Sequence, residues 1–232
     1  MHRVLCFLLL ALLSNPIAAQ DRVTIGVGGL LNNDVFTLTP NNDRWRTGSG
    51  VISVARAPGW DGALPERMGE GLEFRLRGGL ISPKRITGRR LDDRPYAETL
   101  SLGLHTHFQN RGYEYSLGLD LVATGPQTGM ESLQSAIHDI LGIDSATAGA
   151  LRGRVGNGLH PTLAFEMGRT LELSPRIAFR PFLELQGGIE TYARIGGDWH
   201  FGRIGRDALW VRDVTTGQRY ALNRGKEHGW GA

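Results

Sequence analysis

A glutamine and a histidine stand four residues apart, at Gln134 and His138, in the stretch GPQTGMESLQSAIHDILG. Glycines at positions 129 and 142 are typical start and stop signals, so we expect a helix over residues 131–141. Its apolar stripe consists of Leu133, Ile137, Ile140 and Leu141. Residues i and i+4 share one helix face, and imidazole is a common general base near neutral pH. The spacing therefore predicts a base stacked beside an amide, although a plain surface histidine on a loop helix fits the same pattern.

A second group of polar residues lies in LNNDVFTLTPNNDRWRTGSG, residues 31–50. Asn33 and Asp34 stand where the first apolar segment ends, and Thr47 stands where the next one begins. Carboxylate, amide and hydroxyl oxygens are the ligands that calcium prefers. The same residue types are also standard in turns, so this segment taken by itself is better explained as an ordinary polar turn.

The segments that must position these groups alternate between apolar and polar residues, as strands do. Clear examples are LSLGLHTHF and YEYSLGLDL, in which leucines and tyrosines share one face. We expect about nine strands, over residues 23–31, 50–57, 71–82, 97–108, 112–124, 160–173, 176–189, 190–201 and 208–222. A short amphipathic helix among strands has little to pack on except their wall, so we expect it to fold inward or to cap the mouth of a barrel.

Three features favour an all-β, antiparallel outer-membrane β-barrel over a soluble sandwich. The expected strands have the length that a tilted membrane strand needs. The connections after Ala57 and Thr124 are long while QNRGY and LSPR are short, which is the loop asymmetry of such barrels. The polar face suits a hydrated lumen, and we assign to it Glu98, Ser101, Gly103, His105 and Glu166.

The chain begins with a short apolar run that is typical of a secretory signal peptide. We therefore expect a signal peptide over residues 1–20 and a barrel domain over residues 21–232. The single cysteine, Cys6, would leave with the signal, so the exported chain would hold neither a disulfide nor a thiol nucleophile. The net charge of +3 is spread along the chain without a basic cluster, which argues against a nucleic-acid partner.

Several motifs taken together resemble the outer-membrane lipid A 3′-O-deacylases of the LpxR type. They are NND-VF followed by NDRWRTGSG, then DDRPYAETLSLGL, then GPQTG leading into QSAIH, with weaker similarity through NGLHPTLAFEMGRTLEL. The resemblance implies a twelve-stranded barrel whose active site lies between the wall and a helix of an infolded outer loop. Since we find about nine strands and no aromatic-ended last strand, we expect the barrel to be incomplete at its C-terminus.

The resemblance also implies roles for individual residues. Asn33, Gln134 and His138 match catalytic positions, and Asp34 and Thr47 match positions that hold Ca²⁺. For the family's acidic residue after the histidine the nearest candidates are Asp139 and Asp144, of which Asp144 has the better spacing. The implied reaction is calcium-assisted attack of a histidine-activated water on the ester, with no side-chain nucleophile.

Other residues have weaker assignments. Arg44 and Lys84 are candidates for binding the phosphates of lipid A, and Trp45 and Tyr96 are candidates for interfacial aromatics outside the site. The implied partners are lipid A or lipopolysaccharide and the outer-membrane lipid, with no obligate protein partner. Two alternatives stay open: a non-catalytic, porin-like or inactive barrel, and an outer-membrane phospholipase, for which Ser135 would be poorly placed because it projects about 100° around the helix from its neighbour.

Overall fold

The computed structural model describes residues 22–33, 48–83, 94–142 and 144–225. Nine strands form one sheet in this part of the chain. Their bounds are β1 Val23–Asn33, β2 Gly48–Ala57, β3 Gly71–Ile81, β4 Ala97–Asn110, β5 Tyr113–Thr124, β6 Gly158–Gly168, β7 Leu171–Ser174, β8 Ile177–Gly187 and β9 Tyr192–Phe201. Two short strands, β10 Trp210–Arg212 and β11 Arg219–Ala221, pair separately. The helical segments are η2 Pro126–Thr128, α2 Met130–Leu141 and α3 Ala148–Leu151.

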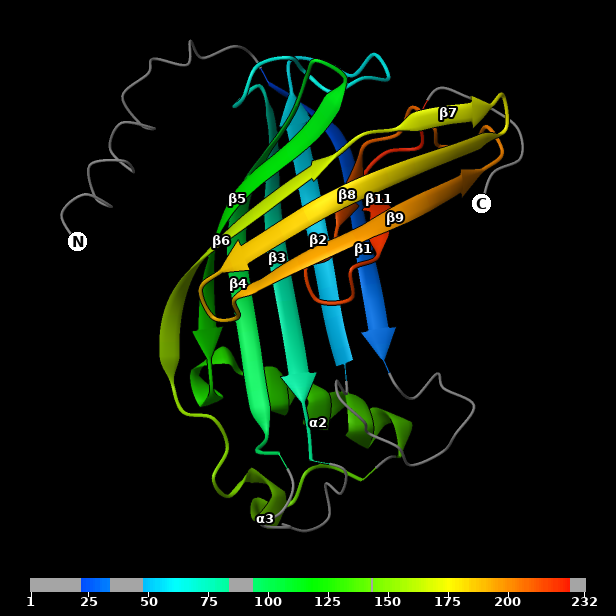
Figure 1. The fold of residues 1–232 in the computed structure, drawn as a ribbon. Coiled ribbons are helices and arrows are strands. Elements are labelled where there is room, and N and C mark those ends of the chain that lie inside the picture. Colours follow the sequence, from blue (N-terminus) through cyan, green and yellow to red (C-terminus); the bar gives the residue numbers. More distant parts are fainter. Residues whose placement is uncertain (1–21, 34–47, 84–93, 143, 226–232) are drawn as a thin grey trace, which may run out of the picture.

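The main sheet is an antiparallel meander that curls into an open barrel (Figure 1). Consecutive strands pair from β1 to β6, β8 pairs with both β6 and β7 on one side, and β9 pairs with β8 on the other. Within the described residues β1 pairs with β2 alone in the main sheet, and β7 and β9 each pair with β8 alone. The expected all-β, antiparallel barrel architecture is confirmed.

The two faces of the sheet are inverted relative to a soluble sandwich. Apolar side chains on the convex face are exposed, and one row of paired residues crosses four neighbouring strands: Ile52 (52% exposed), Leu76 (43%), Leu102 (65%) and Leu121 (46%). Charged side chains point to the concave face and are buried. A water-soluble fold has the opposite distribution, so the sheet is that of a membrane barrel.

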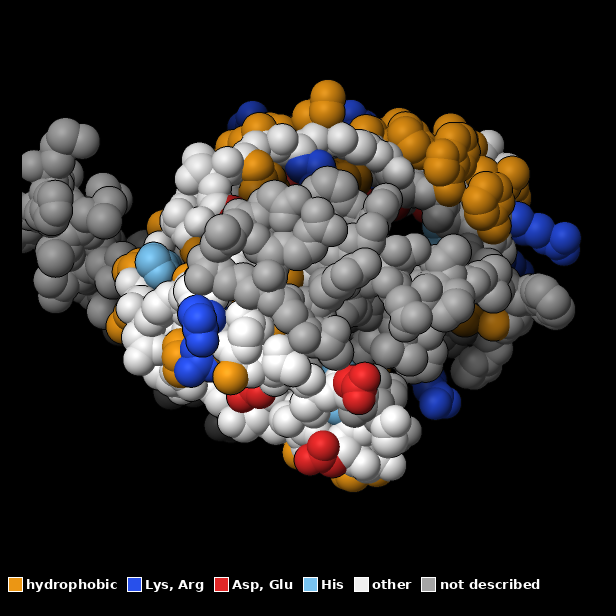
Figure 2. Space-filling view, turned by 90° about the horizontal axis from the view of Figure 1, so that it is seen from below, with side chains coloured by type: hydrophobic (Ala, Val, Ile, Leu, Met, Phe, Trp, Pro, Cys, Tyr) orange, Lys and Arg blue, Asp and Glu red, His pale blue; other side chains and the backbone are white. Residues whose placement is uncertain are grey.

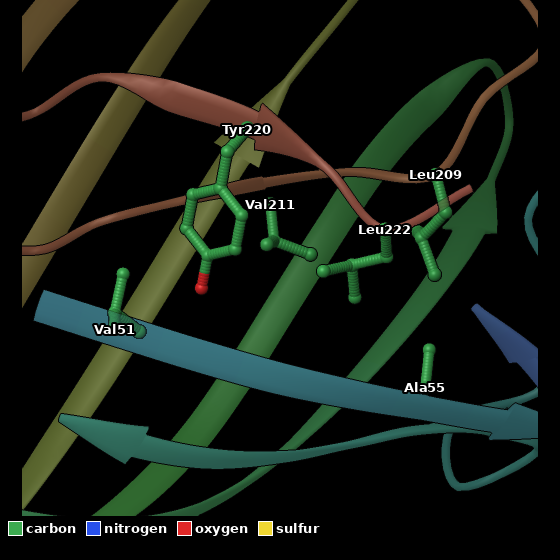
Figure 3. Packing of buried hydrophobic residues seen from close by; sticks show 6 residues of the cluster. All are labelled: Val51, Ala55, Leu209, Val211, Tyr220 and Leu222. Atoms are coloured by element: carbon green, nitrogen blue, oxygen red, sulfur yellow. The ribbon is translucent and has the colours of Figure 1, made fainter. Parts of the chain in front are cut away.

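Ion pairs line the concave face. Arg180 donates to Glu166 at 2.6 Å, and Arg212 of β10 donates to the same carboxylate at 3.0 Å. The hairpin β10–β11 lies within the curl, and it adds a small apolar cluster against β2 (Figure 3). The members of that cluster are Val51, Ala55, Leu209, Val211, Tyr220 and Leu222. The concave face of this part of the chain is thus polar and crossed by ion pairs, and a cavity of about 570 Å³ remains there, lined among others by Glu114, Arg180 and Asp198.

Two strand predictions are wrong. The expected strand over residues 160–173 is two strands, β6 and β7, separated at residues 169–170. The expected long strand over residues 208–222 is the hairpin β10–β11 inside the curl, where Val211 and Tyr220 are 2% and 5% exposed. Alternation marks a strand with two different faces, and it does not show whether that strand belongs to the wall. The expected total of about nine therefore agrees with the main sheet only because these two errors offset each other.

The helices gather at one end of the barrel (Figure 1). Antiparallel order places the connections after β1, β3 and β5 at this end, which we call the helical end. The long connection after Ala57 lies at the opposite end, so the two long segments identified in the sequence do not share one side of the membrane. Among the described residues, no helix is both long and apolar enough to cross a bilayer. The predicted signal peptide lies outside the described residues.

Candidate active site

Helix α2 forms where the sequence predicted it, and its ends are set by glycines. Gly129 precedes it with φ 69° and Gly142 follows it with φ 66°, both in the left-handed region that suits a residue without Cβ. The amide of Gly142 donates to the carbonyls of His138 and Asp139, which closes the last turn. Gly129 has no side chain to cap the first turn, so the helix needs another acceptor for its free amides.

Glu98 of β4 supplies that acceptor. Its Oε2 accepts from the backbone N–H of Glu131 at 3.0 Å and from the Thr128 hydroxyl at 3.2 Å. Glu98 is 1% exposed, and Arg154 lies at 3.5 Å from its other carboxylate oxygen. A carboxylate at a helix N-terminus also interacts favourably with the helix dipole. Glu98 therefore fastens the start of α2 to the barrel wall.

The helix lies against the convex side of the sheet and not in the lumen. On β4, Glu98 belongs to the same alternating series as Leu102 and Leu104, which face outward and are 65% and 48% exposed. On β3, Gly78 belongs to the outward series, and a Cβ built on it would lie 2.8 Å from Sδ of Met130 in α2. Of the two expected positions of the helix, folded inward or capping the mouth of the barrel, the inward one is thus wrong. The assignment of Glu98 to the lumen face is wrong as well. Glu98 and Leu102 are four residues apart, and residues an even number apart in a strand share one face. This spacing is a sequence signal that would have placed Glu98 on the outer face.

The polar face of α2 is the one that faces the protein. Tyr96 is fully buried, and its hydroxyl donates to Oε1 of Gln134 at 2.6 Å. The apolar stripe, which we expected to pack on the wall, is exposed instead: Leu133 is 53%, Ile137 46% and Ile140 83% exposed. Tyr96 is therefore not an interfacial belt residue but part of the site, and the sequence carried no signal for its contact with Gln134.

His138 lies one turn beyond Gln134 on the same face and is partly buried. Its Nδ1 lies 2.8 Å from the backbone carbonyl oxygen of Asp144. A carbonyl can only accept, so Nδ1 carries the proton and Nε2 has the free lone pair. This is the tautomer in which Nε2 can act as a base. The segment after α2 thus orients the imidazole by its backbone, while the side chain of Asp144 is exposed.

Asn33 lies at the same end and on the same outer face. The strand register forms one row, Asn33–Gly48–Leu80–Glu98, and Asn33 shares its alternating series with Leu31, which is 75% exposed. Three strand spacings of about 4.8 Å separate Asn33 from Glu98 by about 14 Å. Figure 1 shows α2 running across the strand ends from the β4 side toward the β1 side. From Glu131 to His138 the helix advances about 10 Å, so it carries the imidazole most of the way toward Asn33.

Four predicted site residues, Asp34, Arg44, Thr47 and Lys84, lie outside the described residues. In the sequence Asp34 directly follows Asn33, and Thr47 directly precedes Gly48. Asn33 and Gly48 are paired across strands β1 and β2. Among the described residues, no three His, Cys, Asp or Glu side chains cluster closely enough to hold a metal ion. The expected ligands are instead mixed amide, carboxylate and hydroxyl oxygens at the end of the β1–β2 pair, a donor set that suits calcium.

Comparison with known proteins agrees with this architecture. A family model described as "Outer membrane protein LpxR" matches residues 4–208. Among solved structures, "LpxR from Salmonella typhimurium" is similar with a TM-score of 0.60 at 19% sequence identity, over 77% of this chain and 63% of that one. This chain therefore spans less than two thirds of that structure's length, and at this identity the similarity concerns the fold. A search of curated proteins found no match.

Proposed function

Because the chain belongs to the family of the outer membrane protein LpxR, we propose that it is an outer-membrane esterase that removes the 3′-linked acyloxyacyl chain of lipid A. The observation that carries the proposal is the orientation of His138. Its Nδ1 is hydrogen-bonded to the Asp144 carbonyl, and its helix face is turned to the outer wall of the barrel.

The position of α2 outside the lumen supports a lipid substrate. Lipid A resides in the outer leaflet, so its ester bonds reach a barrel from the side and not through the lumen. A site between the convex wall and a helix on that wall is open to such a molecule. The concave side of the described part is instead lined by ion pairs such as Arg180–Glu166, and the β10–β11 hairpin occupies part of it.

The proposed reaction begins with His138 as general base. Nε2 takes a proton from a water molecule, and the water oxygen forms a bond to the acyl carbonyl carbon. The bond between that carbon and the 3′ oxygen of the sugar then breaks, and the proton on Nε2 passes to that oxygen. The products are a carboxylic acid and a sugar hydroxyl, and the imidazole returns to its initial state. The Tyr96 bond holds Oε1 of Gln134, which leaves the amide nitrogen of Gln134 to donate to the water or the ester.

Asp34 and Thr47 are the residues we assign to hold calcium, with Asp144 as a further candidate ligand, and Asn33 is assigned a catalytic role beside them. When bound there, the ion supplies positive charge that stabilises the oxyanion formed at the ester carbonyl. Arg44 and Lys84 are proposed to bind the phosphates of lipid A, because cationic side chains pair with phosphate oxygens.

A serine-dependent phospholipase is disfavoured by the contacts of Ser135. Its hydroxyl bonds to the hydroxyl of Ser145 at 3.0 Å, while Nδ1 of His138 bonds to the carbonyl of Asp144, so the two side chains have different partners. A Ser–His mechanism needs the hydroxyl within hydrogen-bond reach of the base. The inactive barrel remains the alternative that the experiment must separate from the deacylase.

Mass spectrometry of lipid A from Gram-negative cells that express the full chain tests the proposal. The wild-type chain should remove the mass of the 3′ acyloxyacyl group, and His138→Ala should leave lipid A intact, as should chelation of calcium in an assay with isolated membranes. Ser132→Ala is the matched control, because Ser132 is exposed on the same helix and away from the site. Lipid A that is unchanged by the wild-type chain at normal expression would support the inactive barrel.

A further inference from the structure

Helix α2 carries an exposed apolar ridge. The ridge consists of Leu133, Ile137 and Ile140, and Ile140, at 83%, is among the most exposed large apolar side chains of the described residues. Exposed apolar ridges on a helix are unfavourable in water, at about 25 cal/mol for each Å². The polar face of the same helix is held to the wall by Tyr96 and Glu98, so the ridge cannot turn inward.

The direction of the ridge follows from helix geometry. Successive residues are rotated by about 100° around a helix. Leu133 and Ile137 directly precede Gln134 and His138, so they point to one side of the face that contacts the sheet. Ser135 and Asp139 directly follow Gln134 and His138, so polar residues occupy the other side.

The handedness of the helix decides whether the apolar or the polar side of α2 points toward the middle of the strands. With Gln134 against the sheet and α2 running from the β4 side to the β1 side, the apolar ridge of a right-handed helix points along the strands toward their middle (Figure 1). There it faces the exposed apolar row of the wall, Ile52–Leu76–Leu102–Leu121. Leu102 lies four residues after Glu98 on β4, about 13 Å along the strand toward its middle. The polar side faces away from the membrane.

From this continuity we propose that α2 is an interfacial helix whose Leu133–Ile137–Ile140 ridge lies in the acyl chains of the outer-leaflet lipid. Figure 2, seen from the helical end, shows apolar side chains gathered along the upper and right part of the outer rim of the molecule, with smaller apolar areas at its lower edge. A helix with one apolar side and one polar side binds at the boundary between acyl chains and headgroups. The lipid layer thereby sets the height at which an ester bond meets the His138 face. This inference concerns lipid contact and does not depend on hydrolysis.

Depth-dependent fluorescence quenching tests it. Ile140→Cys is prepared in a Cys6→Ser background, labelled with an environment-sensitive fluorophore, and reconstituted with lipids that carry a nitroxide on the acyl chain. Ser132→Cys on the polar side of α2 is the matched negative control, and Leu102→Cys on the wall is the positive control. We expect quenching at Ile140 several-fold above that at Ser132 and approaching that at Leu102.

The result that would overturn the proposal is quenching at Ile140 no greater than at Ser132 while Leu102 is quenched. A label at Ile140 that is insensitive to nitroxide lipid but self-quenches as protein density rises would also overturn it, and it would assign the ridge to contact with a second copy of the chain. A second variant, Ile137→Asn with Ile140→Asn, should lower quenching of a label at Leu133→Cys, because the ridge would no longer favour the acyl layer.

Discussion

Replacing Glu98 by alanine removes the acceptor that holds the first turn of α2 to the barrel. Loss of a helix N-terminal acceptor typically costs about 1 kcal/mol, and hydrogen bonds to a charged group are roughly twice as strong as neutral ones. The Glu131 amide is 3.0 Å from a carboxylate that is 1% exposed, so the stronger figure of about 2 kcal/mol applies to local opening of α2. This corresponds to a rise of about 30-fold in the open population of the helix.

Hydrogen–deuterium exchange of the amides of α2 in detergent measures this opening directly. Glu98→Ala should speed exchange over residues 130–141 by about 30-fold and should reduce lipid A hydrolysis, because His138 loses its position. Glu98→Gln keeps an acceptor of the same length without the charge, so we expect an effect of about half the free energy, about 1 kcal/mol. Leu102→Ala, on the same strand and face, is the control. Unchanged exchange of α2 in Glu98→Ala would refute the role assigned to this carboxylate.

Two further predictions concern other contacts of the described chain. Tyr96→Phe removes the 2.6 Å bond to Gln134, and loss of one such bond at about 1 kcal/mol should lower the rate of lipid A hydrolysis about fivefold with little change in the melting temperature. For Asp213, burial by itself raises the pKa, but the charge of Arg77 and the hydrogen bonds from Thr216 outweigh it and hold the pKa below its ordinary value. The stability from this lowered pKa is complete above the ordinary pKa of the carboxyl and is lost as pH falls through the lower, folded-state value. Melting temperatures from pH 6 to pH 3 should therefore fall more in the wild-type chain than in Asp213→Asn, and parallel curves would contradict the assignment.

The sequence alone determined the local elements of this protein. The period of two residues located most wall strands, and the helical period with Gly129 and Gly142 located α2, because each of these signals depends on near neighbours in the chain. The family also followed from motifs spread along the chain, and the match over residues 4–208 confirms it. The i, i+4 spacing correctly placed Gln134 and His138 on one face.

Only the tertiary structure decided which surfaces meet. Periodicity shows that a helix or strand has two faces but not what each face contacts. For this reason α2 was expected to pack its apolar stripe on the wall, whereas it turns its polar face to the wall. Its anchors, Tyr96 and Glu98, lie more than thirty residues away in the chain, and no local pattern pairs them with α2. For the same reason residues 208–222 read as a wall strand but fold as a hairpin inside the curl, since burial is a property of the closed assembly of strands and not of one segment.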